Sequence, residues 1–529
     1  MKRRHMLAGG AAAAALTATG LPMPAIGQVG SKNLLRFVPQ ANLANPDPIW
    51  TTATVAINHG YMVYDTLYGV DDSLTARPQM CAGHELTADE LSWTFTLRDG
   101  LKWHDGERVR AADCTQSIQR WWTKDPFGQQ LALLTDEIKA LDDKSFQIRL
   151  KKRFPQILYA LGAEQCFIMP ERVAKTPASV QIKEYVGSGP FRFLPEEWVS
   201  GAKAVYVKND KYVPRAEPPE FLSGGKVVHF DRVEWSIQPD PATQAAALQA
   251  GEVDWLEFPL IDLLPTLGKA PGCTVVNYDP RGTLAIIAFN HLYKPFDNPK
   301  LLHALLPAID QKEYVTAWVG DQAEYGRYPA GFFTAGTPMA SPAGLEAFTT
   351  PRDIAKARQL VKESGYAGEK VVLMAPSDQA SLVPMCQVTR DIFLKLGINV
   401  DYQVMDWGTL VSRRAKMDPP AQGGWNVFCT TWGGLAVSNP GSSYPLRANG
   451  RKGWFGWPTD DKLEELRQVW FDAPNLAAQK KICEDIQLRA FETIPFMPAG
   501  GWFYPWAVRK DLTDFVRNSQ IVFWGVRRV

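Results

Sequence analysis

Apolar and polar side chains alternate through residues 93–98, whose sequence is WTFTLR. A period of two residues is the pattern of a strand with one buried face, and the Asp-Gly pair that follows predicts a turn. Residues 111–122, AADCTQSIQRWW, repeat their apolar positions at three- and four-residue spacing, which predicts an amphipathic helix. The segment therefore predicts a strand, turns and a helix in that order.

His104 and Asp105 lie between these two elements, in the sequence KWHDG. A His–Asp pair can take part in catalysis when a third polar group orients it, and the sequence places no such group beside this pair. We therefore predict that His104 is a surface side chain next to a turn aspartate and that its role is architectural.

Strand-like and helix-like patterns are interleaved in the rest of the chain. Residues 227–237 and 369–375 have the composition of strands, and residues 353–366 have a helical pattern that begins at Asp353 and ends at Gly365. This interleaving predicts the α/β class. At 529 residues the chain is too long for one small core, so two or more structural units are expected.

The charge of the chain is nearly balanced, with 57 basic and 56 acidic side chains and a net charge of +1. Nucleic-acid binding needs a basic face or stripe, so this balance does not favour a nucleic-acid partner. The seven cysteines are scattered without a Cys-x-x-Cys pair, and we predict no metal site, cofactor or catalytic residue. Their odd number leaves at least one thiol unpaired in an oxidising compartment. The 18 tryptophans offer stacking surfaces as well as core.

Residues 1–27 begin with a basic segment, continue with an apolar run of small residues and end in a small-x-small site near Gly27. This is the pattern of a cleaved export signal, and the apolar run is shorter than the ~20 residues that a membrane-spanning helix needs. The Arg3-Arg4 pair leaves the general secretory and the twin-arginine routes both open. Either route predicts an exported, periplasmic protein.

Residues 93–114, WTFTLRDGLKWHDGERVRAADC, resemble the signature of the extracellular solute-binding proteins of family 5, which include the dipeptide- and oligopeptide-binding proteins of ABC transporters. Four other blocks resemble that family in the same order. VYDTLYG (63–69) resembles its early helix, and VGSGPFRF (186–193) its Gly-Pro turn. ALQAGEVDWLE (247–257) resembles its helix-to-strand step, and residues 287–310 its Phe-Asn and Pro-Phe block. The resemblance covers essentially the whole chain after the export signal.

The resemblance implies an α/β, two-lobed periplasmic binding-protein fold of type II, in the large peptide-binding class with an extra subdomain in lobe I. Lobe I is expected at residues 30–275, lobe II at 280–498, and a C-terminal return to lobe I at 499–529. The implied function is the exported solute-binding component of an ABC transporter. Such a protein captures a small polar solute, peptide-like or other, between its lobes and delivers it to the membrane permease subunits. A monomer without enzymatic activity is expected.

Residues 419–459 correspond, by the resemblance, to the strand and loop that face the ligand. Peptide binders of the family carry an acid there that pairs with the peptide's α-ammonium, whereas this stretch contains no Asp or Glu. Burying an ammonium without a counter-charge costs several kcal/mol, and micromolar binding is worth only ~8 kcal/mol in total. Either another acid supplies the charge, or the ligand is not an ordinary free-amine peptide.

The residues expected to line the ligand site follow from the same correspondence. Trp432 is the strongest candidate, because two glycines follow it and let backbone approach a ligand. For the others, core packing is the main alternative. The candidate ligand-binding residues are Gln40, Asn42, Phe332, Trp407, Trp432, Gly433, Gly434, Asn439 and Trp502.

Two other functions stay open on the sequence. A secreted glycoside hydrolase would need two carboxylates across one cleft, and acid pairs such as Glu196-Glu197 are present without any sign of that placement. A receptor that signals to a membrane sensor would have the same fold as a transport protein. The identity of the solute also stays open.

Overall fold

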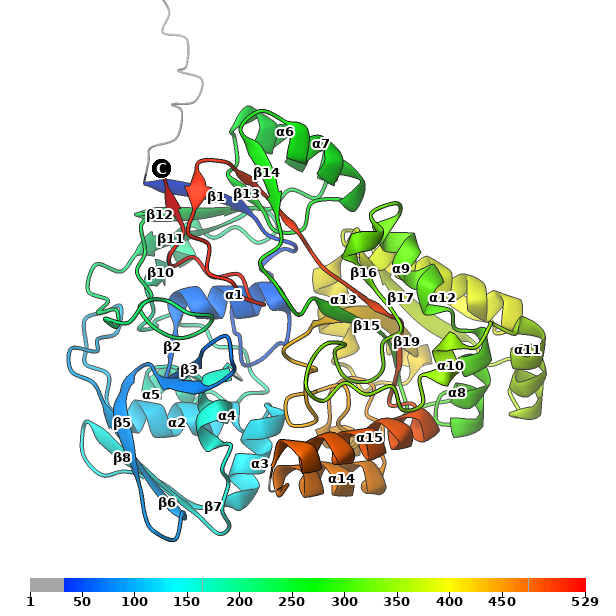
Figure 1. The fold of residues 1–529 in the computed structure, drawn as a ribbon, viewed down its shortest axis with the longest axis horizontal. Helices are drawn as coiled ribbons and strands as arrows, with labels where there is room; N and C mark the ends of the chain where they lie inside the picture. Colours follow the sequence, from blue (N-terminus) through cyan, green and yellow to red (C-terminus); the bar gives the residue numbers. More distant parts are fainter. Residues whose placement is uncertain (1–32, 164, 474) are drawn as a thin grey trace, which may run out of the picture.

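The computed structural model describes residues 33–163, 165–473 and 475–529. Figure 1 shows two bodies side by side, each with its own sheet, and the C-terminus returns to the body that contains the first strand. This is the predicted two-lobed α/β fold. The predicted export signal, residues 1–27, lies outside the described residues. None of the described helices combines the length and the apolar character needed to cross a membrane.

Lobe I, as defined here, is the body built on a seven-stranded sheet with the order β10-β11-β12-β1-β13-β22-β14. Strand β1 runs parallel to both of its neighbours, and the other pairs are antiparallel. The strands are β1 (Leu34–Val38), β10 (Phe191–Phe193), β11 (Lys203–Lys208), β12 (Arg232–Ser236), β13 (Trp255–Leu256), β14 (Cys273–Val276) and β22 (Trp506–Arg509), and the helices are α1 (Thr54–Val63), α6 (Pro241–Ala250) and α7 (Leu264–Lys269).

Lobe II is the body built on a five-stranded sheet with the order β18-β17-β19-β15-β20. Every residue of its strand β17 is buried, which fits a strand covered on both faces. The strands are β15 (Thr283–Phe289), β17 (Val371–Pro376), β18 (Val400–Met405), β19 (Val427–Gly433) and β20 (Phe496–Pro498). The helices are α8 (Pro299–Leu305), α9 (Gln311–Val319), α10 (Glu346–Thr349), α11 (Ile354–Glu363), α12 (Leu382–Leu396), α13 (Trp407–Arg414), α14 (Asp461–Phe471) and α15 (Leu476–Thr493).

A separate four-stranded antiparallel sheet forms the extra subdomain, at the lower left of Figure 1. Its strands are β5 (Cys81–Leu86), β6 (Ser92–Leu97), β7 (Thr135–Ala140) and β8 (Ser145–Leu150), accompanied by α2 (Ala111–Trp121), α3 (Pro126–Leu134), α4 (Ile157–Ala163) and α5 (Glu171–Ala174). Helix α3 lies nearest to lobe II, where the ring of Phe127 packs against Phe471 of α14 at a centroid distance of 5.3 Å.

The remaining elements are short. They are the strand pairs β2 (Asp65–Thr66) with β9 (Phe167–Ile168), β3 (Tyr68–Val70) with β4 (Ala76–Pro78), β16 (Gly326–Arg327) with β21 (Gly501–Trp502), and β23 (Leu512–Thr513) with β24 (Arg527–Arg528). Single 3-10 turns lie at Pro195–Glu197, Ile261–Leu263, Leu306–Ala308, Ala323–Tyr325, Pro420–Gln422 and Gly450–Lys452.

The chain passes between the two sheets twice. It leaves the seven-stranded sheet at the end of β14 and enters the five-stranded sheet at β15, and it returns between β21 and β22. The segments 277–282 and 503–505 are therefore the two crossings between the lobes. The residue limits of the lobes given above from the sequence stay a prediction.

Most local predictions agree with the structure. Strand β6 and helix α2 confirm the predicted strand and helix on either side of the HDG turn. In helix α11, the carboxylate of Asp353 accepts from the backbone N–H of Lys356 at 2.8 Å, and Gly365 follows the helix with φ +84°. These features are local, so the sequence pattern was sufficient to predict them.

One local prediction is wrong, and one is right only in part. Residues 63–69 are not a helix, because α1 ends at Val63 and the short strands β2 and β3 follow. The reason is tertiary: a Cβ on Gly69 would lie 2.2 Å from the carbonyl oxygen of Leu222, so a distant segment packs directly on this backbone. In residues 227–237, only β12 is a strand.

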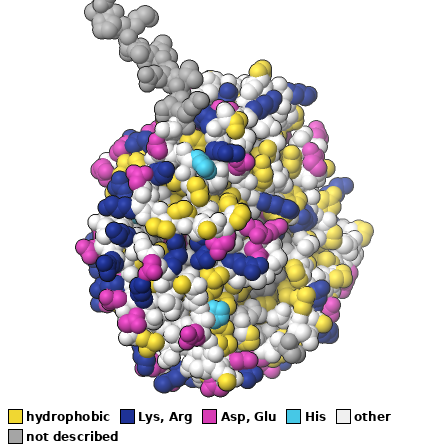
Figure 2. All heavy atoms as spheres, turned by 60° about the vertical axis from the view of Figure 1, so that its left-hand side comes forward, with side chains coloured by type: hydrophobic (Ala, Val, Ile, Leu, Met, Phe, Trp, Pro, Cys, Tyr) yellow, Lys and Arg dark blue, Asp and Glu magenta, His cyan; other side chains and the backbone are white. Residues whose placement is uncertain are grey.

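The tryptophans serve mainly as core. Around Phe37 of β1, the rings of Trp235, Trp255 and Phe523 lie at centroid distances of 5.6, 5.2 and 5.1 Å. All seven cysteines are free and buried, in agreement with the expectation of at least one unpaired thiol. On the face shown in Figure 2, basic and acidic side chains are interspersed, as the balanced net charge suggests.

His104 has the predicted architectural role, but the prediction that it is a surface side chain is wrong. The half-buried imidazole joins the HDG turn to residues 186–193: its Nδ1 accepts from the backbone N–H of Gly187 at 3.2 Å, and its Nε2 lies 3.1 Å from the carbonyl oxygen of Gly189. These partners require a neutral ring with the proton on Nε2. Burial lowers the pKa of His104 to about 4, which keeps the ring neutral.

We expect His104→Ala to lower the free energy of unfolding by about 2 kcal/mol, because two partly buried hydrogen bonds are lost, and to leave solute binding unchanged. The pKa of His104 is below its unfolded value, so its contribution is complete above pH ~6.5 and is lost as pH falls towards 4. The difference between wild type and variant should therefore shrink over that window in urea unfolding. His229→Ala, at an exposed histidine of lobe I, is the control. Equal stability of the two variants would contradict the structural role.

Candidate ligand-binding site

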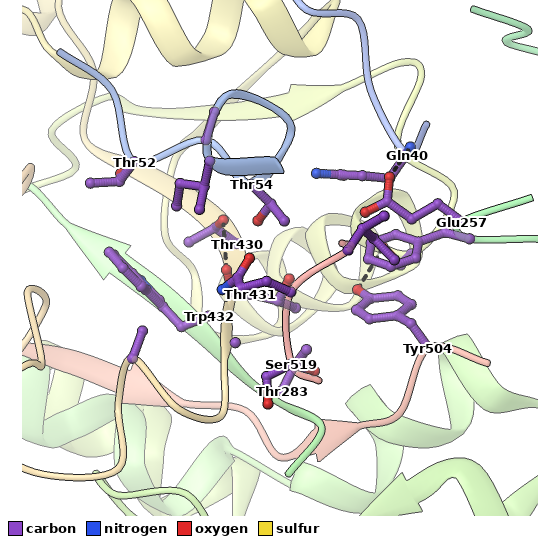
Figure 3. Close-up of a pocket in the computed structure, with 18 of the residues that line it drawn as sticks. Gln40, Thr52, Thr54, Glu257, Thr283, Thr430, Thr431, Trp432, Tyr504 and Ser519 are labelled. Atoms are coloured by element: carbon purple, nitrogen blue, oxygen red, sulfur yellow. Dashed lines mark hydrogen bonds between the residues drawn. The ribbon is translucent and has the colours of Figure 1, made fainter. Parts of the chain in front are cut away.

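A cavity of about 110 Å³ lies between the lobes, large enough for several water molecules or a compact solute. Lobe I supplies the chain after β1, the segment before and at the start of α1, and the end of β13. Lobe II supplies the end of β19 and the buried face of α13. The two crossings, residues 518–521 and other side chains of lobe II, among them Gln379, Tyr444 and Trp454, also line it. Figure 3 shows Gln40 and Glu257 on one side of this space and Thr52 and Trp432 on the other.

Trp432 is held at the end of β19 by other rings. Its ring stacks on Tyr444 at 5.6 Å with an interplanar angle of 18°, and it meets the edge of Trp454 at 5.2 Å. The side chain is 8% exposed, and within the described part of the chain its Nε1–H has no hydrogen-bond partner. The wall of the cavity therefore includes a rigid aromatic ring whose buried N–H has no partner among the described residues.

Arg414 is the last residue of α13 and belongs to its apolar face. Trp407, Leu410, Val411 and Arg414 follow one another at helical spacing, and all four are buried. The guanidinium lies over four aromatic rings, those of Trp407, Phe428, Trp454 and Phe455, at 5.0–5.8 Å from their centroids. The rings supply cation–π attraction but no counter-charge.

The charge of Arg414 is therefore not paired within the described chain. Its Nη2 reaches only the hydroxyl of Thr52 at 3.5 Å, its Nε has no partner, and no carboxylate of a described residue lies within ion-pair distance. Burial lowers its pKa to about 9, which still leaves the group charged at neutral pH. Unpaired buried guanidinium groups are costly, and no described residue supplies the anion that would offset this cost.

Glu257 follows β13 and is 1% exposed. Its Oε2 accepts from the backbone N–H of Gln40 at 2.7 Å and its Oε1 from the side-chain amide of Asn58 at 3.0 Å. Among the described residues, no Lys or Arg pairs with it. Burial raises its pKa to about 7, so the carboxyl is close to half-ionised at neutral pH.

Asp279 is the second acid on the wall and belongs to the first crossing. It accepts from the backbone N–H of Arg281 at 3.0 Å and from the hydroxyl of Ser519 at 2.7 Å, which ties the crossing to the C-terminal segment. Burial raises its pKa, and the nearby Arg281 opposes that shift. In the described part of the chain, no group of three or more His, Cys, Asp and Glu side chains is arranged to hold a metal ion.

Four of the predicted ligand-binding residues lie on the wall of the cavity, and their contact with a solute stays a prediction. They are Gln40, Trp407, Trp432 and Gly433. A Cβ on Gly433 would meet nothing closer than 4.0 Å, so this glycine leaves open space. The carbonyl of Gln40 also accepts from the amide of Gln379 in lobe II at 2.9 Å.

Three polar or small candidates are used by the fold and are not on the wall. Asn42 accepts from the backbone N–H of Gly201 at 2.7 Å, which places its side chain towards a surface turn. Gly434 donates its N–H to the carbonyl of Gly282, and a Cβ there would lie 2.8 Å from that oxygen, so this glycine permits contact with the first crossing and not with a solute. Asn439 accepts from the N–H groups of two residues of its own turn.

Two aromatic candidates are core residues. Phe332 is fully buried against Phe491 and Phe496, each at a ring distance of 5.0 Å. Trp502 is 1% exposed and packs beside Trp318 and Tyr504. Both side chains therefore lie in the core of the lobe and not on the cavity wall, because the many aromatic residues of their segments pack against one another.

The sequence prediction missed the two charged residues of the wall, Arg414 and Glu257, that lack an oppositely charged partner among the described residues. Arg414 had a local signal, a charge at an apolar position of a helix, in the spacing of Trp407, Leu410 and Val411. Glu257 had none, because an acid after a short strand is common at the surface. The pair Glu196-Glu197 lies away from the cavity, where Glu197 pairs with Arg232.

A second set of contacts joins the extra subdomain directly to lobe II. The hydroxyl of Tyr444 donates to the carboxylate of Asp125 at the start of α3, at 3.0 Å. Gly441 packs so closely on the ring of Phe127 that a Cβ there would lie 2.4 Å from it. Because Tyr444 also stacks on Trp432, the wall of the cavity and the contact between the lobes share one side chain.

Comparison with known proteins gives one family. Residues 75–454 match the family described as bacterial extracellular solute-binding proteins, family 5 Middle. The "Probable peptide ABC transporter periplasmic-binding protein y4tO" of Sinorhizobium fredii is 35% identical over 530 residues, which cover 100% of this chain and 99% of that protein. The glutathione-binding protein GsiB of Salmonella typhi is 27% identical over 402 residues, 74% of this chain and 73% of that one.

Solved structures agree on the fold. DppA from Helicobacter pylori, in complex with the peptide STSA, superposes with a TM-score of 0.79 at 19% identity over 94% of this chain and 98% of its own. AgaA from A. tumefaciens R10, in complex with agropinic acid, has a TM-score of 0.76 at 21% identity over 94% and 99%. The resemblance predicted from the sequence blocks is thus confirmed, and the chain belongs to the bacterial extracellular solute-binding proteins of family 5.

Proposed function

We propose that this protein is the periplasmic solute-binding component of an ABC transporter and that it captures a compact solute bearing a carboxylate. The observation that carries the proposal is Arg414, a buried guanidinium on the cavity wall without an acid partner in the described chain. The solute leaves the cavity chemically unchanged and passes to a membrane permease. The protein acts as a monomer.

A carboxylate fits the cation better than a neutral solute does. Guanidinium and carboxylate form two parallel hydrogen bonds, and charge-assisted bonds are roughly twice as strong as neutral ones. The same contact removes the desolvation cost of the unpaired cation, so it favours the closed lobes over the open ones. The ligands named for relatives, a peptide and agropinic acid, are solutes with carboxyl groups, which supports this class.

The other two functions are less well supported. A glycosidase needs one carboxyl to give a proton and another to attack or to activate water, whereas Asp279, the second acid on the wall, is held as an acceptor by Arg281 and Ser519 of the protein. A receptor for a membrane sensor would use the same cavity, and no described feature favours it over transport.

A thermal-shift screen tests the proposal. The probes are amino acids, di- and tripeptides, monocarboxylic acids, neutral oligosaccharides and C-amidated peptides. A probe at 100 times its Kd adds ~2.7 kcal/mol of stability, which is easily measured. We expect stabilisation only by probes with a free carboxylate. Stabilisation by oligosaccharides and amides alone would rule the carboxylate class out.

Trp432→Ala is expected to weaken the best carboxylate probe about tenfold or more, because a solute loses its aromatic surface and an N–H donor. The unfolding transition should stay cooperative, since the side chain lies at the end of β19 on the cavity. Trp122→Ala removes a half-buried tryptophan of the extra subdomain away from the wall and serves as control. If calorimetry shows the same loss of affinity in both variants, Trp432 is a packing residue.

A further inference from the structure

The cavity holds an unpaired buried charge of each sign. Arg414 has no acid partner and Glu257 has no basic partner among the described residues, although both line the same space. They do not pair with each other. In Figure 3, Glu257 lies beside Gln40 on one side of the cavity, and Thr52, whose hydroxyl is the contact of Arg414, lies on the other.

Glu257 keeps accepting capacity on the side of the cavity. An ionised carboxylate has about four lone-pair positions, and two protein donors, the N–H of Gln40 and the amide of Asn58, occupy one on each oxygen. Both donors are neutral, so they orient the carboxylate without neutralising it. Glu257 lines the cavity, so a solute held there could use the remaining positions.

A buried acid without a cationic partner among the described residues costs stability. Carboxylates are among the groups least often buried without a cationic partner, and an amide or an apolar side chain of similar size would be held at lower cost. Burial raises the pKa of Glu257 to about 7 for this reason. A cationic group brought by the solute would remove the penalty, as a carboxylate does at Arg414.

We propose that Glu257 binds a protonated amine of the same solute whose carboxylate is held by Arg414, so that the captured solute is a zwitterion. This inference rests on the proposed function. It also answers the question raised by residues 419–459, which contain no acid: the counter-charge comes from lobe I and not from the strand and loop of lobe II.

Asp279 is a weaker candidate for the same role. It lies on the first crossing, its carboxylate accepts from Arg281 and Ser519, and the guanidinium of Arg281 already attracts its charge. Asp279 therefore has partners of its own, whereas the donors to Glu257 among the described residues are neutral.

The test uses alanine, dialanine and trialanine, each in its free, N-acetylated and C-amidated form, with Kd measured by calorimetry at pH 7.5. For the scaffold that binds best, we expect the wild type to prefer the free form over the N-acetylated form by at least about 30-fold. In Glu257→Gln, which keeps the shape and can still accept from Gln40, this preference should fall below about threefold.

Asp254→Asn is the matched control. Asp254 is a buried acid three residues before Glu257, it is paired with Arg528, and it is not on the cavity wall. Its variant should keep the 30-fold preference.

A second measurement follows pH: because burial raises the pKa of Glu257, binding of the free form should weaken from pH 7.5 to 5.5 in the wild type and not in Glu257→Gln. The other titratable groups on the wall, Asp279, Arg414, Tyr444 and Tyr504, are unchanged in that variant.

Each failure has its own signature. The role of Glu257 is overturned if the free and N-acetylated forms bind equally, or if the preference is unchanged in Glu257→Gln. The proposal that Arg414 binds a carboxylate then still stands. If the preference for the free form is lost in Asp279→Asn and kept in Glu257→Gln, the amine is bound by Asp279 of the first crossing, and the assignment to Glu257 is wrong. If no probe with a free carboxylate binds in any form, the proposed function fails, and the zwitterion fails with it.

Discussion

Methionine in place of Arg414 is expected to abolish the binding of carboxylate-bearing probes and to leave the ligand-free protein as stable as the wild type or more stable. The guanidinium lies over four rings without an acid partner in the described chain, so its removal breaks no ion pair. Replacing buried charges by apolar side chains of similar volume is often neutral or stabilising. A thioether also packs well against aromatic rings.

The expected loss of affinity is at least about 100-fold, because a bidentate charge-assisted contact is worth roughly 3 kcal/mol. Arg413→Met is the matched control. Arg413 donates to Gln403 and to the carbonyls of Gly423 and Gly424, and it is not on the cavity wall. It should therefore show the opposite result, with lower stability and unchanged affinity. Calorimetry and thermal unfolding of the two variants measure both quantities. A clear loss of stability in Arg414→Met with affinity retained would make Arg414 a structural residue.

Gly441→Ala is expected to weaken solute binding at least about tenfold without unfolding the protein, because it holds the lobes apart. The new Cβ would lie 2.4 and 2.5 Å from ring carbons of Phe127 on α3. That ring cannot move aside, since it is fully buried and packs against Trp470 and Phe471 of lobe II. Separation of the lobes relieves the overlap, and every solute that needs the closed form must then offset the cost of closure.

Small-angle scattering measures this effect directly. With saturating probe the wild type should become more compact, whereas Gly441→Ala should need much more probe for the same change. Gly83→Ala is the control, because a Cβ on Gly83 meets nothing within 4 Å. Equal affinity and equal compaction in Gly441→Ala and wild type would show that the contact between α3 and lobe II has no part in closure.

The element types and the fold class could be predicted from the sequence because they depend on local patterns. The alternation in residues 93–98 and the helical spacing in 111–122 produced β6 and α2 as expected. The prediction failed at residues 63–69, where a segment about 150 residues away packs against Gly69. His104 is a similar case, since its hydrogen-bond partners lie more than 80 residues further along the chain.

The candidate site was predictable only in part. Gln40, Trp407, Trp432 and Gly433 lie on the cavity wall, because they follow β1, begin α13 or end β19 at the edge where the lobes meet. Phe332 and Trp502 do not, because an aromatic residue that packs in the core has the same local sequence as one that lines a cavity.

By itself the sequence determined the α/β class, the family and the absence of an acid from residues 419–459. Only the tertiary structure decided which charges lack partners. The apolar spacing around Arg414 shows that the residue is buried, but its unpaired state depends on every acid that the fold keeps away from it. Glu257 faces the same cavity because β13 pairs with β1, which is more than 200 residues earlier in the chain. Burial and charge pairing are properties of contacts between distant segments, and no local pattern encodes them.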